Sequence, residues 1–167
     1  MSRLIRLHGS VVERALTAEA TDATTAAAAL PAELQAPVHE ADGSDWIRRS
    51  TMVGVNIRTV GSFWRVIHYS LTLSPLVNAI HLLPIWEPGV VGSLYGMASW
   101  QLNAEFLDTE LAELYPHLHT AERQLRAVIN VLHATGRSVG MDVIPHTDRF
   151  SEMVLAQPAY FEWLRRT

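Results

Sequence analysis

The chain has 167 residues, of which 49% are hydrophobic, which is enough for one domain with a sizeable core. The formal net charge of −4 is mild and has the wrong sign for nucleic acid to be the expected partner. The absence of cysteine excludes disulfides, thiolate zinc sites and a cysteine nucleophile.

The sequence also lacks the usual signals for membranes and secretion. No stretch approaches the ~18 consecutive apolar residues of a membrane span. The N-terminus "MSRLIRLHGSVVERAL" has basic residues but no apolar segment of the kind found in a secretory signal. We therefore expect a cytoplasmic protein with no membrane partner.

Residues 1–50 differ in composition from the rest and are interpreted as an Ala/Thr-rich extension. The stretch "TAEATDATTAAAALPAELQAP" contains the helix breakers Pro31 and Pro37 and shows no clean apolar stripe. We predict a poorly ordered or helical extension. Low-complexity linker is the favoured interpretation, with at most a short helix near residues 11–20.

From residue 51 the chain shows the patterns of a folded domain. "TMVGVNIRT" alternates, with Val53, Val55 and Ile57 on one face, and predicts a strand. Ser62 is placed to cap a following helix. The apolar stripe of that helix would be Phe63, Val66, Ile67 and Leu71, and Ser74 and Pro75 would end it.

A second strand and a long connection follow. "NAIHLLPIW" is a nearly continuous apolar run, typical of a strand buried on both faces, and Pro84 suits its end. The connection that follows, from residue 87 to residue 119, carries aromatic residues that include Tyr95, Trp100 and Phe106. We predict no regular structure for this connection.

The remainder predicts one more helix–strand–helix series. Thr120 would begin a helix that Gly136 ends, with Leu125, Val128, Ile129 and Leu132 as its apolar stripe. "SVGMDVI" is the next strand, and Ser151 would cap a final helix that Pro158 interrupts. Because strands alternate with helices, we predict an α/β fold with a parallel sheet, either an open doubly wound sheet or a (β/α) barrel.

In a parallel barrel, functional residues lie where strands end and loops begin. Residues 56–59, 84–87 and 142–147 qualify. Asp142 is the sharpest candidate, because an acid in an apolar strand is costly unless it is paired or hydrogen-bonded. His146 follows a proline that stops the strand. Both residues have structural alternatives, an aspartate bonded to loop amides and a histidine packed on its neighbours.

Tyr95 and Trp100 lie in a connection that also contains glycines at positions 89, 92 and 96. Exposed aromatic side chains on a functional face suit the flat, apolar faces of sugars. The alternative is a small apolar cluster under a long loop. For His117 and His119, an H-x-H pair, a metal site with Asp142 and His146 is the less favoured interpretation, because the pair lies in a proline-bounded loop.

Three segments together resemble the alpha-amylase family of glycoside hydrolases. They are "AIHLLPIWEP", "SLYGMASWQLNAEF" and "RQLRAVINVLHATGRSVGMDVIPHT", within residues 52–167. In that family a second barrel strand ends in Leu-Pro-Ile/Leu, a loop carries two aromatics five residues apart, a helix ends in "AH..G", and a third strand carries Asp-Val-Val-x-Asn-His. The matching residues here are Pro84, Ile85, Tyr95, Trp100, His133, Gly136 and 142–144.

The chain departs from the family pattern at three positions. Tyr95 is preceded by Leu94 where the family has glycine, His146 stands where it has asparagine, and Thr147 where it has histidine. The family asparagine often binds calcium. Because an imidazole is a poor calcium ligand, no metal site is carried over and no cofactor is expected.

The resemblance implies a partial (β/α)8 TIM-type barrel, about the first three βα units, from an enzyme acting on α-glucosidic bonds. An eight-fold barrel takes about 250 residues. The family's catalytic acids come from strands four, five and seven, so no catalytic residue is predicted here. The chain is expected to be an N-terminal fragment that is inactive alone.

The substrate-binding residues implied by the resemblance are Tyr95, Trp100, Asp142 and His146, with an α-glucan or oligosaccharide as ligand and a complementing C-terminal chain as a further partner. Two alternatives stay open. One is a small non-catalytic α/β domain that binds carbohydrate or protein. The other is a metal-dependent hydrolase that uses the histidines.

Overall fold

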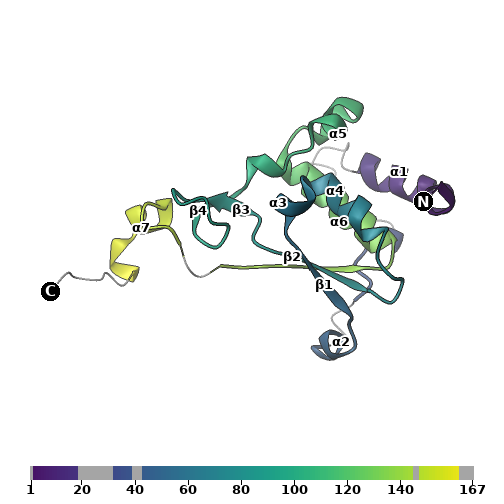
Figure 1. The fold of residues 1–167 in the computed structure, drawn as a ribbon, viewed down its shortest axis with the longest axis horizontal. Helices are drawn as coiled ribbons and strands as arrows, with labels where there is room; N and C mark the ends of the chain where they lie inside the picture. The colour runs from purple at the N-terminus through teal and green to yellow at the C-terminus, as the bar shows by residue number, and fades with distance from the viewer. Residues whose placement is uncertain (1, 19–31, 39–42, 145–146, 162–167) are drawn as a thin grey trace.

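The computed structural model describes residues 2–18, 32–38, 43–144 and 147–161 (Figure 1). Its α-helices are α1 Ser2–Thr17, α2 Asp45–Arg48, α3 Ile57–Val60, α4 Phe63–Ser70, α5 Thr109–Leu114, α6 Ala121–Ala134 and α7 Glu152–Ala156. Its strands are β1 Met52–Val55, β2 Ala79–Leu82, β3 Trp86–Pro88, β4 Met97–Leu102 and β5 Ser138–Met141. Short 3-10 helices are η3 Ala32–Leu34, η5 Ala104–Phe106, η6 Pro116–Leu118 and η7 Pro158–Tyr160.

Three strands form a parallel sheet in the order β1-β2-β5. The register pairs Val53 with Ile80 and Ile80 with Val139. Helix α4 connects β1 to β2, helix α6 lies between β2 and β5 in the chain, and Figure 1 shows both helices on the same side of the sheet. The predicted α/β fold with a parallel sheet is therefore confirmed.

Both covering helices begin where the sequence predicts. Helix α6 also ends as predicted, whereas α4 ends at Ser70, before the predicted Ser74 and Pro75. The Ser62 hydroxyl accepts from the Arg65 amide at the start of α4, and Thr120 accepts from the Arg123 amide at the start of α6. Gly136, two residues beyond α6, has a φ of 76°, which glycine adopts without strain. The predicted apolar stripes face the sheet, because Phe63, Val66 and Val128 are fully buried.

One hydrophobic core lies between the helices and the sheet. Phe63 of α4 and Phe106 of η5 meet edge to face at its centre, with ring centroids 5.8 Å apart. Val55, Ile80 and Leu82 come from the strands, and Leu125, Val128, Val131 and Leu132 come from α6. Burying this apolar surface is the main source of stability for the sheet.

The prediction of the first strand is wrong at its carboxyl end. Strand β1 stops at Val55, and Ile57, predicted to continue the alternation, opens the short helix α3. The Asn56 side chain accepts from the Arg58 amide, which caps this helix. Ile57 is buried all the same, so its apolar character reflects burial and not strand geometry.

The long connection contains structure that the sequence did not predict. Strands β3 and β4 form an antiparallel pair with an irregular register between Trp86 and Pro88, and α5 follows. Strand β3 is only three residues long and ends in proline. A segment this short shows no measurable alternation, which is why the periodicity failed to reveal it.

The N-terminal extension is helical over Ser2–Thr17, and this helix packs against α6. Ala15 and Leu16 are buried, and so is Leu34 of η3, whose carbonyl lies 3.1 Å from His133 Nδ1. The linker interpretation is therefore wrong for these parts of the extension, because they bury apolar side chains on the core. Residues 19–31 and 39–42 lie outside the described residues.

A three-stranded sheet with its helices on one face fits the first units of a barrel. It also fits one half of a doubly wound sheet, in which the strands follow the same order. The observed fold is thus α/β at the coarser level. Across the described ranges, no helix is both long enough and apolar enough to cross a membrane.

Candidate functional site

Asp142 lies at the carboxyl end of β5, where its side chain pairs with a histidine from the neighbouring strand. His81 Nε2 is 2.8 Å from Asp142 Oδ1. An ionised carboxylate only accepts hydrogen bonds, so the imidazole Nε2–H donates. Each side chain keeps 29% of its surface exposed, so the pair is half-buried and reached by solvent.

The register of the sheet explains how an imidazole fits at this place. His81 lies between Gly54 of β1 and Gly140 of β5, at the same level of the sheet. A Cβ atom on residue 140 would be only 2.8 Å from His81 Nδ1. Glycine at position 140 therefore makes room for the ring, which lies across β5 toward Asp142. Because side chains alternate along a strand, this pair is on the face opposite the core residues Ile80 and Leu82.

One tryptophan binds the backbone of Asp142, and a second tryptophan packs on the first. The Trp86 indole Nε1–H donates to the Asp142 carbonyl at 3.0 Å, which ties the start of the hairpin to the end of β5. The Trp86 and Trp100 rings meet edge to face with centroids 5.0 Å apart. Trp100 is 45% exposed, and its Nε1 lies 2.8 Å from Met153 Sδ of α7. The structure thus brings Trp100 to Asp142 through Trp86.

The other two predicted substrate-binding residues are not joined to this cluster by a described contact. Tyr95 lies in the turn between β3 and β4, where its ring is 52% exposed and its amide donates to Ser93 Oγ. His146 lies outside the described residues. Tyr95 is therefore available to a ligand from the same hairpin that carries Trp100.

Nearby acids already have partners. Ser99 Oγ donates to Glu87 Oε2 at 2.7 Å within the hairpin. Arg58 of α3 binds both carboxylate oxygens of Glu105 at 2.5 and 2.9 Å and donates to the Gly92 carbonyl, which anchors the hairpin loop. The hydrogen bond from Arg58 holds the pKa of Glu105 below its ordinary value. This leaves Asp142 as the acid at this edge that pairs with a partly exposed imidazole.

A groove of about 430 Å³ adjoins the tryptophans. It runs between the hairpin, α6 and β5, and its lining is mainly apolar. The lining residues are Ile85, Trp86, Trp100, Gln101, Leu102, Glu122, Leu125, Arg126, Ile129 and Met141. The half-exposed face of Trp100 is therefore continuous with a concave apolar surface.

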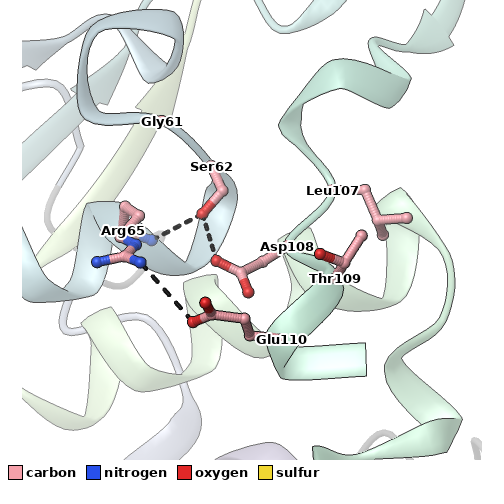
Figure 2. Close-up of a pocket in the computed structure, with 7 residues that line it drawn as sticks. All are labelled: Gly61, Ser62, Arg65, Leu107, Asp108, Thr109 and Glu110. Atoms are coloured by element: carbon pink, nitrogen blue, oxygen red, sulfur yellow. Dashed lines mark hydrogen bonds and ion pairs between the residues drawn. The ribbon is translucent and has the colours of Figure 1, made fainter. Parts of the chain in front are cut away.

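A second pocket, of about 300 Å³, has a structural explanation. Figure 2 shows Ser62 and Asp108 pointing at each other between α4 and α5, with an oxygen–oxygen distance of 2.6 Å. Asp108 also accepts from the Leu111 amide and so caps α5. Arg65 reaches Glu110 at 3.8 Å on the exposed rim. These side chains join two helix starts and satisfy one another.

The histidine pair of the metal interpretation is directed at backbone carbonyls. His117 Nε2 is 2.7 Å from the Leu16 carbonyl, and His119 Nδ1 is 3.0 Å from the Pro116 carbonyl. Within the described part of the chain, no three His, Asp or Glu side chains gather as a metal site would require. His117 instead fastens α1 to the loop before α6.

No model of a known protein family matches the chain, and no curated protein sequence matches it. Inference about function therefore depends on the motifs and on how the fold arranges them.

His81 and Trp86 are the site residues that sequence reasoning missed. Both lie in "NAIHLLPIW", which reads as buried strand throughout. The signal was present, since His81 is the single polar ring in the run and Gly140 stands two residues before Asp142. Only the strand register shows that histidine, glycine and aspartate share one face.

Proposed function

We propose that residues 51–167 are the first three β/α units of an alpha-amylase-like barrel and bind α-glucosyl units at the carboxyl edge of the sheet. The observation that carries the proposal is the His81–Asp142 pair at that edge, with Trp86 bound to the Asp142 carbonyl and packed on Trp100. This arrangement combines charged and polar acceptors with a half-exposed aromatic platform, which is what sugar hydroxyls and sugar ring faces need.

The order of the motifs supports the proposal. Pro84 follows β2, the aromatic pair Tyr95 and Trp100 belongs to the hairpin after β2, and Asp142 follows β5. This is the sequence of positions that the family resemblance implies. The helices that precede and follow β2 cover one face of the sheet, as successive units of a barrel would.

The enzyme proposed here hydrolyses or transfers α-glucosyl units through carboxylates supplied by later barrel strands. Retaining hydrolysis needs two carboxyl groups about 5–5.5 Å apart across the bond. At the described edge, Glu87 and Glu105 are engaged with Ser99 and Arg58, and Asp142 with His81. We expect the 167-residue chain to release no reducing sugar from soluble starch until a complementing chain supplies those acids.

The test is calorimetric titration of the full chain with maltoheptaose, with cellohexaose as the β-linked control. The proposal expects binding of maltoheptaose that Trp100→Ala weakens about ten-fold or more, as loss of a stacking partner would. Ile47→Ala, at an exposed residue of α2, is the matched control and should leave binding unchanged. Equal binding of both glucans, or none, contradicts the proposal.

A non-catalytic binding domain is the second candidate. The groove beside β5 favours it, because exposed apolar concavities often accept protein partners. This candidate expects a stable monomer whose chemical unfolding is two-state and whose partner is not a glucan. If the chain unfolds cooperatively and the maltoheptaose titration shows no heat of binding, this candidate is favoured over the hydrolase proposal.

A further inference from the structure

Strand β5 forms an open edge of the parallel sheet. It pairs with β2 on one side, and within the described ranges no strand pairs with its other side. The Asp142 amide, just after β5, donates to the Leu82 carbonyl of β2. Because backbone groups alternate along a strand, the N–H and C=O groups of Val139, Met141 and Val143 point away from β2. These three residues therefore offer a row of donors and acceptors to another strand.

The side chains along this edge are apolar and exposed. Met141 is 41% exposed and Val143 is 72% exposed. The strand register places Val139 and Met141 on the helix side of the sheet, with the core residues of β2. Edge strands are usually protected by charges, prolines or bulges. Residues 138–144 contain no proline, and their one charged residue, Asp142, points to the opposite face. Nothing on the helix side of this edge therefore blocks pairing.

The other edge of the sheet is a poorer template. Strand β1 is only four residues long, and the Val55 carbonyl at its end accepts from the Leu83 amide. By the same alternation, only Met52 and Gly54 face the free side of β1. Helix α3 begins two residues after this strand. A contact between two β5 edges also closes on itself, so it gives a dimer and not a filament.

We propose that the chain forms a symmetric dimer in which β5 pairs with β5 of a second copy. A two-fold axis brings identical edges together antiparallel. With the axis at Met141, this residue opposes itself, and Val139 opposes Val143 of the second copy, so the contacts on the helix side are apolar. On the opposite face Asp142 opposes Gly140, which keeps the two carboxylates apart. An axis at Asp142 would place like charges directly opposite each other, at a cost in stability.

Helix α6 carries a charge pattern that suits a second copy. Glu122 and Arg126 are one turn apart and line the same groove as Met141. A two-fold axis reverses the order of the two charges in the second copy, so Glu122 of each copy faces toward Arg126 of the other. A purely acidic or purely basic partner would meet a like charge at this place. The charge pattern therefore favours a second copy as the occupant.

This dimer does not depend on the proposed sugar binding. The apolar contacts lie on the helix side of the sheet, whereas His81 and Asp142 pair on the opposite face. The next strand of the proposed barrel would use the same edge of β5. A complementing chain and a second copy therefore exclude each other there.

The test is sedimentation velocity of the full chain over a range of protein concentrations. We expect a reversible dimer of twice the 18.6 kDa chain mass. Met141→Lys places two like charges at the axis and should raise the dimer dissociation constant about ten-fold or more. Met52→Lys is the matched control, because Met52 is also 41% exposed but lies on β1. It should leave the dissociation constant unchanged.

A charge swap separates loss of pairing from loss of folding. Met141→Glu alone should weaken the dimer as Met141→Lys does. An equimolar mixture of the two variants should recover the dimer, because opposite charges then meet at the axis. Recovery in the mixture shows that residue 141 opposes itself, which a folding defect would not explain. A monomer at every concentration, a dimer that Met141→Lys leaves intact, a mixture that stays monomeric, or an open-ended series of larger assemblies overturns the inference.

Discussion

The two faces of the parallel sheet differ in burial and in the kind of residue they carry. The face under α4 and α6 carries Val55, Ile80 and Leu82, all buried. The opposite face carries Gly54, His81 and Gly140 at one level, and Asp142 beyond them, with the two polar side chains half-exposed. One strand thus alternates between a residue that stabilises the sheet and a residue available for chemistry. Substitutions on the first face should affect folding, and substitutions on the second should affect binding.

The largest expected effect is on the packed face. Phe63→Ala removes a fully buried ring that meets Phe106 edge to face. We expect a loss of about 3–5 kcal/mol in the free energy of unfolding, measured by urea denaturation. Phe150→Ala, at a ring that is 60% exposed, is the control and should change it by less than about 0.5 kcal/mol. A similar loss for both variants would contradict the argument that burial of Phe63 stabilises the packed side.

The next effect concerns the pocket of Figure 2. Asp108→Ala removes the cap of α5 and the partner of Ser62. The free energy of unfolding should fall by about 1–3 kcal/mol, while maltoheptaose affinity stays constant because the pocket is structural. Glu110→Ala, on the same helix but exposed, should have almost no effect on either quantity. A selective loss of affinity in Asp108→Ala would make this pocket a binding site.

A smaller change in stability should accompany a large change in binding at Gly140. An added Cβ would lie 2.8 Å from His81 Nδ1, so Gly140→Ala displaces the imidazole from Asp142. The free energy of unfolding should fall by about 1 kcal/mol, because the ring can rotate away. Maltoheptaose binding should weaken markedly in the same variant. Gly54→Ala is the matched control, since its Cβ would meet only Leu83 at 3.8 Å. Equal affinities in the two variants would contradict the account.

The smallest effect is a pH dependence on the packed side. Burial holds the pKa of His133 below its ordinary value of 6.5, although its bond to the Leu34 carbonyl opposes the shift. The unfolded chain therefore binds this proton more readily than the folded chain does. The contribution of His133 to stability is complete above pH 6.5 and declines as the pH falls toward the folded pKa. His133→Gln should flatten this part of the stability profile, measured by thermal unfolding across pH 5–8. An unchanged profile would contradict the burial argument.

The sequence revealed the packed face better than the open one. Periodicity identified Phe63, Val66 and Val128 because core helices repeat every three to four residues. It also placed Ser62, Thr120 and Ser151 as helix caps, and all three accept from an amide at a helix start. Helix caps and apolar helix stripes involve residues that are close together in the sequence, so local sequence patterns predict them.

The contacts on the open face come from pairing between strands that are far apart in the sequence, which no local sequence pattern reveals. His81 and Asp142 are 61 residues apart, and only the register of β2 against β5 brings them together. Trp86 was treated as the end of an apolar strand, whereas its indole binds the Asp142 carbonyl. Sugar binding by Trp100 was predicted from its place in the long connection and from the family resemblance, and it stays a prediction. Contacts between distant segments bring His81, Trp86 and Asp142 together.

The most direct test of the account is a map of NMR shifts in the full chain on addition of maltoheptaose. The account predicts that the Trp86 and Trp100 indole resonances and the Asp142 amide resonance shift together, while those of Leu111 and Arg65 at the pocket of Figure 2 stay in place. Shifts confined to that pocket, or no shifts at all, would contradict the claim that the carboxyl edge of the sheet binds α-glucosyl units.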